Sequence, residues 1–190
     1  MRSRQRLMIA GAALLAALAG ASCSSELTNN SAPVEMVVTN TQNLSQLDLF
    51  GGTRCGENIG TINVRVIPKN SASTGTFTQV RVTRYRVSYQ RTDGGTLVPA
   101  PFVRSTDALV AVGTTGSALS DFLVVQGDAL LQAPFAALFP NNGGRDPETG
   151  RPVVTMDVIV EVFGQTLGGD NVYDATRFPL DFCYDCGGCS

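Results

Sequence analysis

Residues 154–162 alternate more regularly between apolar and polar side chains than any other part of the chain. The even positions are all Val or Met, whereas Thr155, Asp157 and Glu161 stand at odd positions. Because successive side chains of a strand point to opposite faces, this pattern predicts a β-strand with one face buried and the other toward solvent. We therefore expect a fold organised around a half-buried sheet.

A second strand is predicted directly after the first. Residues 164–171 contain a Gly-Gly-Asp-Asn turn, and residues 172–182 then place Phe178, Leu180 and Phe182 on one face. Two alternating runs joined by such a turn indicate a hairpin.

Several shorter runs upstream also read as strands. Residues 62–66 alternate and stop at Pro68, and residues 80–91 change phase near Thr83 and Arg84, which indicates a β-bulge. The remaining predicted strands are residues 97–103, which two prolines restrict to a sheet edge, residues 110–112 and residues 119–125.

The expected fold is all-β, with about seven or eight strands and one short helix in a connecting segment. The helix is predicted over 127–139, interrupted at Pro134 and ended by Pro140, and a loop follows over 141–152. Short strands separated by turns resemble an immunoglobulin-like or fibronectin-like antiparallel β-sandwich. The chain has no Trp, so the buried tryptophan of true immunoglobulin domains is absent.

The first residues have the features of an export signal. Three arginines precede a 14-residue uncharged stretch from Leu7 to Gly20, which is short for a membrane-spanning helix. The following run, Leu18 to Cys23, resembles the lipobox of bacterial lipoproteins, and this resemblance implies that Cys23 is lipidated and becomes the new N-terminus. The alternative is an ordinary secretory signal cut after Ala19 or Ala21.

We therefore predict a signal peptide over 1–22, a lipid-anchored flexible tether over 23–36 and a single domain with a Cys-rich tail over 37–190. The tether is rich in Ser, Asn and Thr and holds too few apolar residues for a core. Ser24 after the lipidated cysteine resembles sorting to the outer membrane, facing the periplasm or the cell surface.

Charge and composition argue against several functions. Removal of residues 1–22 leaves 11 basic and 16 acidic residues, a net charge of −5, and Lys69 is the only lysine. A nucleic-acid partner is not expected, because phosphate binding needs clustered positive charge. The absence of His excludes His-dependent triads and most catalytic zinc sites, so we predict no enzyme, no cofactor and no metal.

Four cysteines remain after Cys23, and we expect disulfides among Cys55, Cys183, Cys186 and Cys189. The favoured pairing joins Cys55 to Cys183 and Cys186 to Cys189, although four cysteines allow three pairings. A four-cysteine zinc site and a redox centre at residues 186–189 are the alternatives.

Candidate binding residues are few. Tyr85 and Tyr89 share one strand face and could stack on a sugar or a peptide, although a core role is the competing interpretation. Four arginines crowd the same region and could bind an acidic ligand: Arg81, Arg84, Arg86 and Arg91. A carboxylate pair of Asp157 and Glu161, and calcium ligands in residues 141–148, are weaker hypotheses beside a solvated strand face and a polar turn.

The sequence thus predicts a non-enzymatic cell-envelope lipoprotein with a structural, adhesion or interaction role and a protein partner in the envelope. A carbohydrate-binding or small-ligand-binding lipoprotein and an envelope thiol-disulfide protein are the alternatives. A ligand-binding role predicts a concave aromatic pocket, whereas an assembly role predicts an exposed apolar edge or patch.

Overall fold

The computed structural model describes residues 31–40, 45–50, 62–72, 74–113, 116–119 and 122–186. The signal peptide, the lipidation site Cys23, most of the tether, and the cysteines Cys55 and Cys189 lie outside the described residues. Among the described residues, no helix is long and apolar enough to cross a bilayer.

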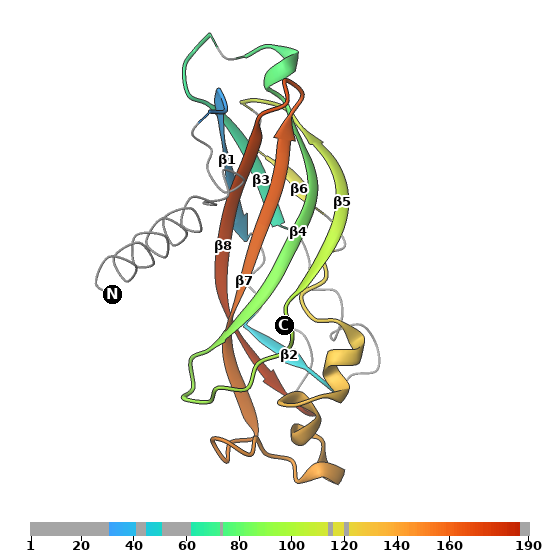
Figure 1. The fold of residues 1–190 in the computed structure, drawn as a ribbon. Coiled ribbons are helices and arrows are strands. Elements are labelled where there is room, and N and C mark those ends of the chain that lie inside the picture. Colours follow the sequence, from blue (N-terminus) through green and yellow to red (C-terminus); the bar gives the residue numbers. More distant parts are fainter. Residues whose placement is uncertain are drawn as a thin grey trace, which may run out of the picture.

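The described chain is all-β and forms two sheets (Figure 1). The smaller sheet has the order β1-β3-β6 and contains β1 (Val34–Asn40), β3 (Ile62–Pro68) and β6 (Ser117–Leu119). The larger sheet has the order β2-β8-β7-β4-β5 and contains β2 (Gln46–Asp48), β8 (Asn171–Cys183), β7 (Val153–Thr166), β4 (Val80–Arg91) and β5 (Phe102–Val110). Neighbours pair antiparallel except β2, which runs parallel to β8.

The core lies against the concave face of the larger sheet, which is long and curled. The smaller sheet covers the upper part of this face in Figure 1, and the segment around residues 122–142 covers the lower part. The rings of Phe135 and Phe182 lie 4.6 Å apart in this lower part, and both side chains are fully buried. One continuous core therefore joins both layers.

The main predicted strands are confirmed. β7 and β8 form the expected hairpin, and the even residues from Val154 to Val162 are all fully buried. The register of β4 shifts between Val82 and Arg84, where the change of phase predicted a bulge. The edge strand lies further along the chain than expected: residues 97–101 are irregular, and β5 begins at Phe102, directly after the two prolines, and runs to Val110. The separate strand expected over 110–112 is therefore not found.

Three further expectations need correction. The single helix expected over 127–139 is replaced by short 3₁₀ turns, because Pro134 and Pro140 lack the amide hydrogens that a continuous helix would use: η3 (Gly127–Leu131), η4 (Phe135–Leu138) and η5 (Pro140–Asn142). The end of the tether is strand, since β1 begins at Val34 and pairs with β3. The segment expected as a strand from 119 to 125 contributes to β6 only at its start, and residues 122–125 are irregular.

Candidate functional site

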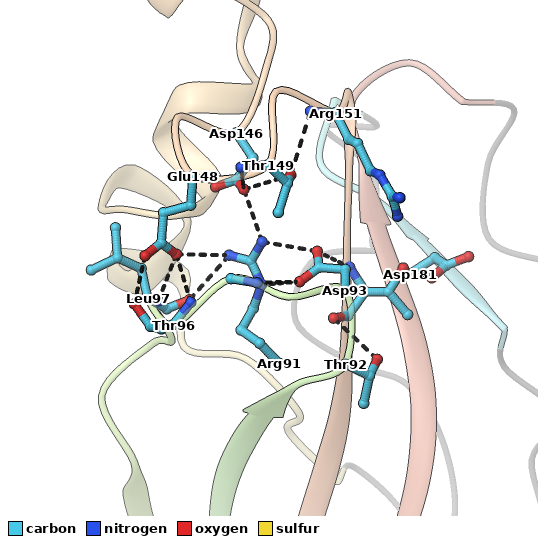
Figure 2. Close-up of polar contacts among 12 residues, drawn as sticks. Arg91, Thr92, Asp93, Thr96, Leu97, Asp146, Glu148, Thr149, Arg151 and Asp181 are labelled. Atoms are coloured by element: carbon cyan, nitrogen blue, oxygen red, sulfur yellow. Dashed lines mark hydrogen bonds and ion pairs between the residues drawn. The ribbon is translucent and has the colours of Figure 1, made fainter.

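A buried ionic cluster around Arg91 occupies the end of β4 (Figure 2). Arg91 Nε and Nη2 donate to the two carboxylate oxygens of Asp93 at 2.7 and 2.8 Å, and Nη2 also donates to Asp146 Oδ2 at 2.8 Å. Nη1 donates to the carbonyl oxygen of Leu97 at 3.2 Å and lies 3.7 Å from Glu148 Oε2. The side chains of Arg91, Asp93 and Asp146 are at most 1% exposed.

Burial disfavours the charged form of every group in this cluster, but the hydrogen bonds and ion pairs within the cluster outweigh the effect of burial. Burial by itself would raise the pKa of Asp93, yet hydrogen bonds from Arg91 and from the amides of Gly95 and Thr155 lower that pKa to about 2. Asp146 also has a lowered pKa despite burial, through Arg91 and Thr149. The two carboxylates in turn raise the pKa of Arg91, so all three groups stay ionised at neutral pH.

The Arg91 cluster joins two loops. Glu148 accepts hydrogen bonds from the amides of Thr96 and Leu97, each at 2.8 Å, and so ties the loop after β4 to the loop before β7. Asp146 and Glu148 are thus directed at Arg91, although the sequence suggested them as calcium ligands. No group of three or more Asp, Glu, His or Cys side chains within the described ranges is arranged to hold a metal ion.

The outer face of the larger sheet carries a row of aromatic and charged side chains. The Arg84 guanidinium lies 4.7 Å from the centre of the Phe163 ring, and that ring lies 5.2 Å from the ring of Tyr173. The Tyr173 hydroxyl donates to Glu161 at 3.1 Å, and Glu161 also lies 3.4 Å from Arg86. We call these five residues the outer-face row. Arginine and aromatic side chains of this kind are enriched at protein interfaces.

The structure does not bring Asp157 and Glu161 together as a carboxylate pair. Four residues along a strand separate them by roughly 13 Å, whereas glycoside cleavage needs carboxyl groups roughly 5 to 9.5 Å apart. Each carboxylate forms an ion pair with a different arginine: Asp157 lies 3.4 Å from Arg177, and Glu161 lies 3.4 Å from Arg86. These residues stabilise a strand face.

Among the described residues, the larger sheet ends at an edge strand, β5, next to the outer-face row. β5 pairs with β4 and is the last strand in the sheet order. Val103, opposite Arg86, is 58% exposed, and Leu109, opposite Arg81, is 55% exposed. Apolar side chains on an open edge strand provide a surface for pairing with another chain.

Tyr85 and Tyr89 lie in the core. The sequence left a core role and a ligand-binding role open for them. They are 5% and 8% exposed. The Tyr89 hydroxyl donates to the carbonyl oxygen of Val124 at 2.6 Å, and the Tyr85 hydroxyl accepts from the amide of Leu123 at 3.2 Å. Both therefore hold the irregular segment 122–125 against the sheet and present no aromatic platform to solvent.

The structure joins Cys183 to Cys186, with Cα atoms 6.0 Å apart. This corrects the favoured pairing of Cys183 with Cys55 and of Cys186 with Cys189, because the chain turns back directly after β8. Asp48 on β2 holds that turn by accepting hydrogen bonds from the amides of Asp185 and Cys186 at 2.9 and 3.0 Å. The other two cysteines, Cys55 and Cys189, lie outside the described residues.

Neither of two hollows on the described surface combines the features of a ligand site. The first is lined by Arg84, Phe163 and Asn171 among others and holds about 140 Å³, below the roughly 300 to 1,000 Å³ of most ligand pockets. The second holds about 490 Å³ between Leu138, Pro140 and Tyr184, with Asp185 its only charged lining residue. It lacks the converging polar groups that orient a bound molecule.

Sequence reasoning missed the acidic members of the Arg91 cluster and the aromatic part of the outer-face row. Phe163 continues the odd-numbered, solvent-facing positions of β7. The alternation therefore could have predicted an aromatic side chain on the outer face of the sheet. Asp146, by contrast, comes from a separate loop 55 residues away from Arg91, and no sequence pattern links the two. No protein-family model, no curated protein and no solved structure matches this chain, so its function has to be argued from this geometry.

Proposed function

We propose that this chain is a non-enzymatic, lipid-anchored domain of the bacterial cell envelope that binds a protein partner through β5 and the adjoining outer-face row. The lipid is attached at Cys23, in the outer membrane, and the domain faces the periplasm or the cell surface. The proposed fold is immunoglobulin-like.

The order of the strands supports an immunoglobulin-like sandwich. If the strands β1, β3, β4, β5, β6, β7 and β8 are taken as A, B, C, C′, E, F and G, the two sheets read A-B-E and C′-C-F-G. Immunoglobulin-like domains divide their strands between two sheets in this manner. The short β2 adds a parallel partner to the last strand.

The observation that carries the proposed role is the pair of exposed apolar side chains on the edge strand β5. An assembly role was expected to show such an edge, and Val103 and Leu109 are both more than half exposed there. The outer-face row lies one strand further in, where Arg84 and Arg86 of β4 adjoin β5. A partner strand added to β5 would gain backbone hydrogen bonds and reach these side chains.

The two alternatives have less support. A ligand-binding role was expected to show a concave aromatic pocket, but Tyr85 and Tyr89 are core residues. A redox role needs a stabilised thiolate, yet the Asp48 carboxylate accepts from the Cys186 amide at 3.0 Å. A negative charge this close disfavours a thiolate.

Site-specific photo-crosslinking in the native cell tests the interaction role. A benzoylphenylalanine residue at Val103 is expected to form a discrete adduct with one envelope protein, whereas the same residue at Leu131, which is 76% exposed on η3, is expected to form none. The second substitution Arg86→Glu should abolish the adduct at position 103 without changing the amount of folded protein, because Arg86 is half exposed.

Absence of a discrete adduct at Val103, or an adduct that forms equally at Leu131, would refute the proposed interface. An adduct that survives Arg86→Glu would restrict the interface to the β5 edge and remove the outer-face row from it.

A further inference from the structure

One end of the sandwich carries two exposed apolar side chains on adjoining segments. Phe77 lies on η2 (Thr76–Thr78) and is 74% exposed, and Leu167 lies in the turn between β7 and β8 and is 44% exposed. The amide of Leu167 donates to the carbonyl oxygen of Gln79, and that of Gly168 to the carbonyl oxygen of Phe77, both at 2.9 Å. We call residues 74–79 with 165–169 the apolar tip.

The apolar tip contains no charged residue. Its residues are Thr, Gly, Phe, Gln and Leu, and the nearest charges along the chain are Arg81, two residues beyond Gln79, and Asp170, directly after Gly169. An uncharged surface can enter the boundary between lipid headgroups and acyl chains without burying an ionised group, and Phe and Leu are side chains that favour this region.

The chain enters the fold at the same end. Val34 pairs with Pro68, and the amide of Lys69 donates to the carbonyl oxygen of Pro33 at 3.0 Å. Figure 1 shows the start of β1, η2 and the turn between β7 and β8 together at the upper end of the molecule. An anchor that holds Pro33 near a membrane therefore also brings the apolar tip toward that membrane.

The length of the tether restricts the orientation further. Ala32 is already buried in the core, so residues 24–31 lie between Cys23 and the fold. When fully extended, these 8 residues reach at most roughly 29 Å. β7 has 14 residues and so spans roughly 45 Å. An upright domain with its opposite end on the membrane would hold residue 33 farther away than the tether reaches.

We infer that the apolar tip is a membrane-contacting surface, with Phe77 and Leu167 inserted at the interface of the bilayer that holds the lipid anchor. This inference rests on the proposed lipidation of Cys23. A lipid surface is the occupant favoured over a protein, because the anchor attaches at this end and the tip has no charges to specify a protein partner. The contact would point the opposite end of the sandwich away from the membrane.

Tryptophan fluorescence tests the inference, because the natural chain contains no Trp. Full-length Phe77→Trp and Leu167→Trp variants, purified from native membranes, are reconstituted into phosphatidylethanolamine and phosphatidylglycerol vesicles with or without brominated acyl chains. Leu131→Trp is the matched control, since Leu131 is 76% exposed and belongs to η3, the short helical turn whose yellow-orange ribbon lies in the lower half of Figure 1. Intact mass of the same samples reports the lipid on Cys23.

Trp at 77 and at 167 is expected to emit at shorter wavelength than Trp at 131, and bromine is expected to quench it while leaving Trp at 131 unchanged. A lipidated protein in which all three variants are equally unquenched would overturn the membrane contact and leave the anchor standing. An unlipidated protein would overturn the anchor. If the Trp of Phe77→Trp were unquenched in that unlipidated protein, the membrane contact would be refuted together with the anchor. Quenching of the same Trp would show that the apolar tip binds lipid without the anchor.

Discussion

The substitution Arg91→Met should destabilise the protein far more than the loss of an exposed arginine. It removes the bidentate contact to Asp93 and the contact to Asp146 but leaves both carboxylates buried, at most 1% exposed. Removal of one partner from a buried ion pair costs roughly 3 to 5 kcal/mol, because the remaining charge is uncompensated. Domain stabilities are roughly 5 to 15 kcal/mol, so this loss is a large fraction of the total.

Urea unfolding followed by circular dichroism measures this loss, and thermal unfolding should show a Tm lower by roughly 6 to 20 °C for a domain of this size. Arg81→Met is the matched control, since Arg81 makes a similar bidentate contact to Asp107 at 2.7 Å but the pair is 58% and 66% exposed. An exposed pair contributes roughly 0 to 1 kcal/mol.

The decrease in unfolding free energy caused by Arg91→Met should also be smaller at acid pH, because the unpaired carboxylates of Asp93 and Asp146 can then take up protons. If Arg91→Met and Arg81→Met lower the unfolding free energy by the same amount within about 1 kcal/mol, the Arg91 cluster does not hold the two loops together.

Three further predictions follow from single contacts. Tyr89→Phe should cost roughly 1 to 3 kcal/mol in urea unfolding, since it leaves the buried carbonyl of Val124 without its donor; a loss no larger than that of Tyr173→Phe would contradict this. The stabilisation by Asp93 should be complete above its unfolded pKa, near 4, and lost as the pH falls toward its folded pKa of about 2, so that Asp93→Asn flattens the acid limb of the stability profile. Digestion without reduction by a protease that cuts before Asp should give peptide 181–184 linked to peptide 185–190, and fragmentation of the linked peptides should place the bridge between Cys183 and Cys186; a bridge from Cys183 to Cys189, or to Cys55 in peptide 48–92, would refute this pairing.

The sequence predicted the strands with the longest alternation but missed β1, where Val34, Met36 and Val38 alternate with less buried residues. The β7–β8 hairpin and the bulge in β4 could be read directly, because period-two patterning reports the two faces of a strand. Alternation says little about a segment that packs without regular hydrogen bonding, and residues 122–125 were therefore read as strand although the hydroxyls of Tyr85 and Tyr89 hold them.

The candidate site was harder to predict, since it depends on contacts between distant segments. Arg91 and Asp146 are 55 residues apart, and no local pattern links them. The cysteine pairing failed for a related reason. The turn after β8 is set by the Asp48 carboxylate, which lies far away along the chain.

The central claim, a lipid-anchored envelope domain, is tested most directly by the intact mass of the protein taken from native membranes. We expect a chain that begins at Cys23 and carries the added mass of two or three acyl chains. An unmodified chain that begins at Gly20 or Ser22, or one that retains residues 1–22, would contradict the claim.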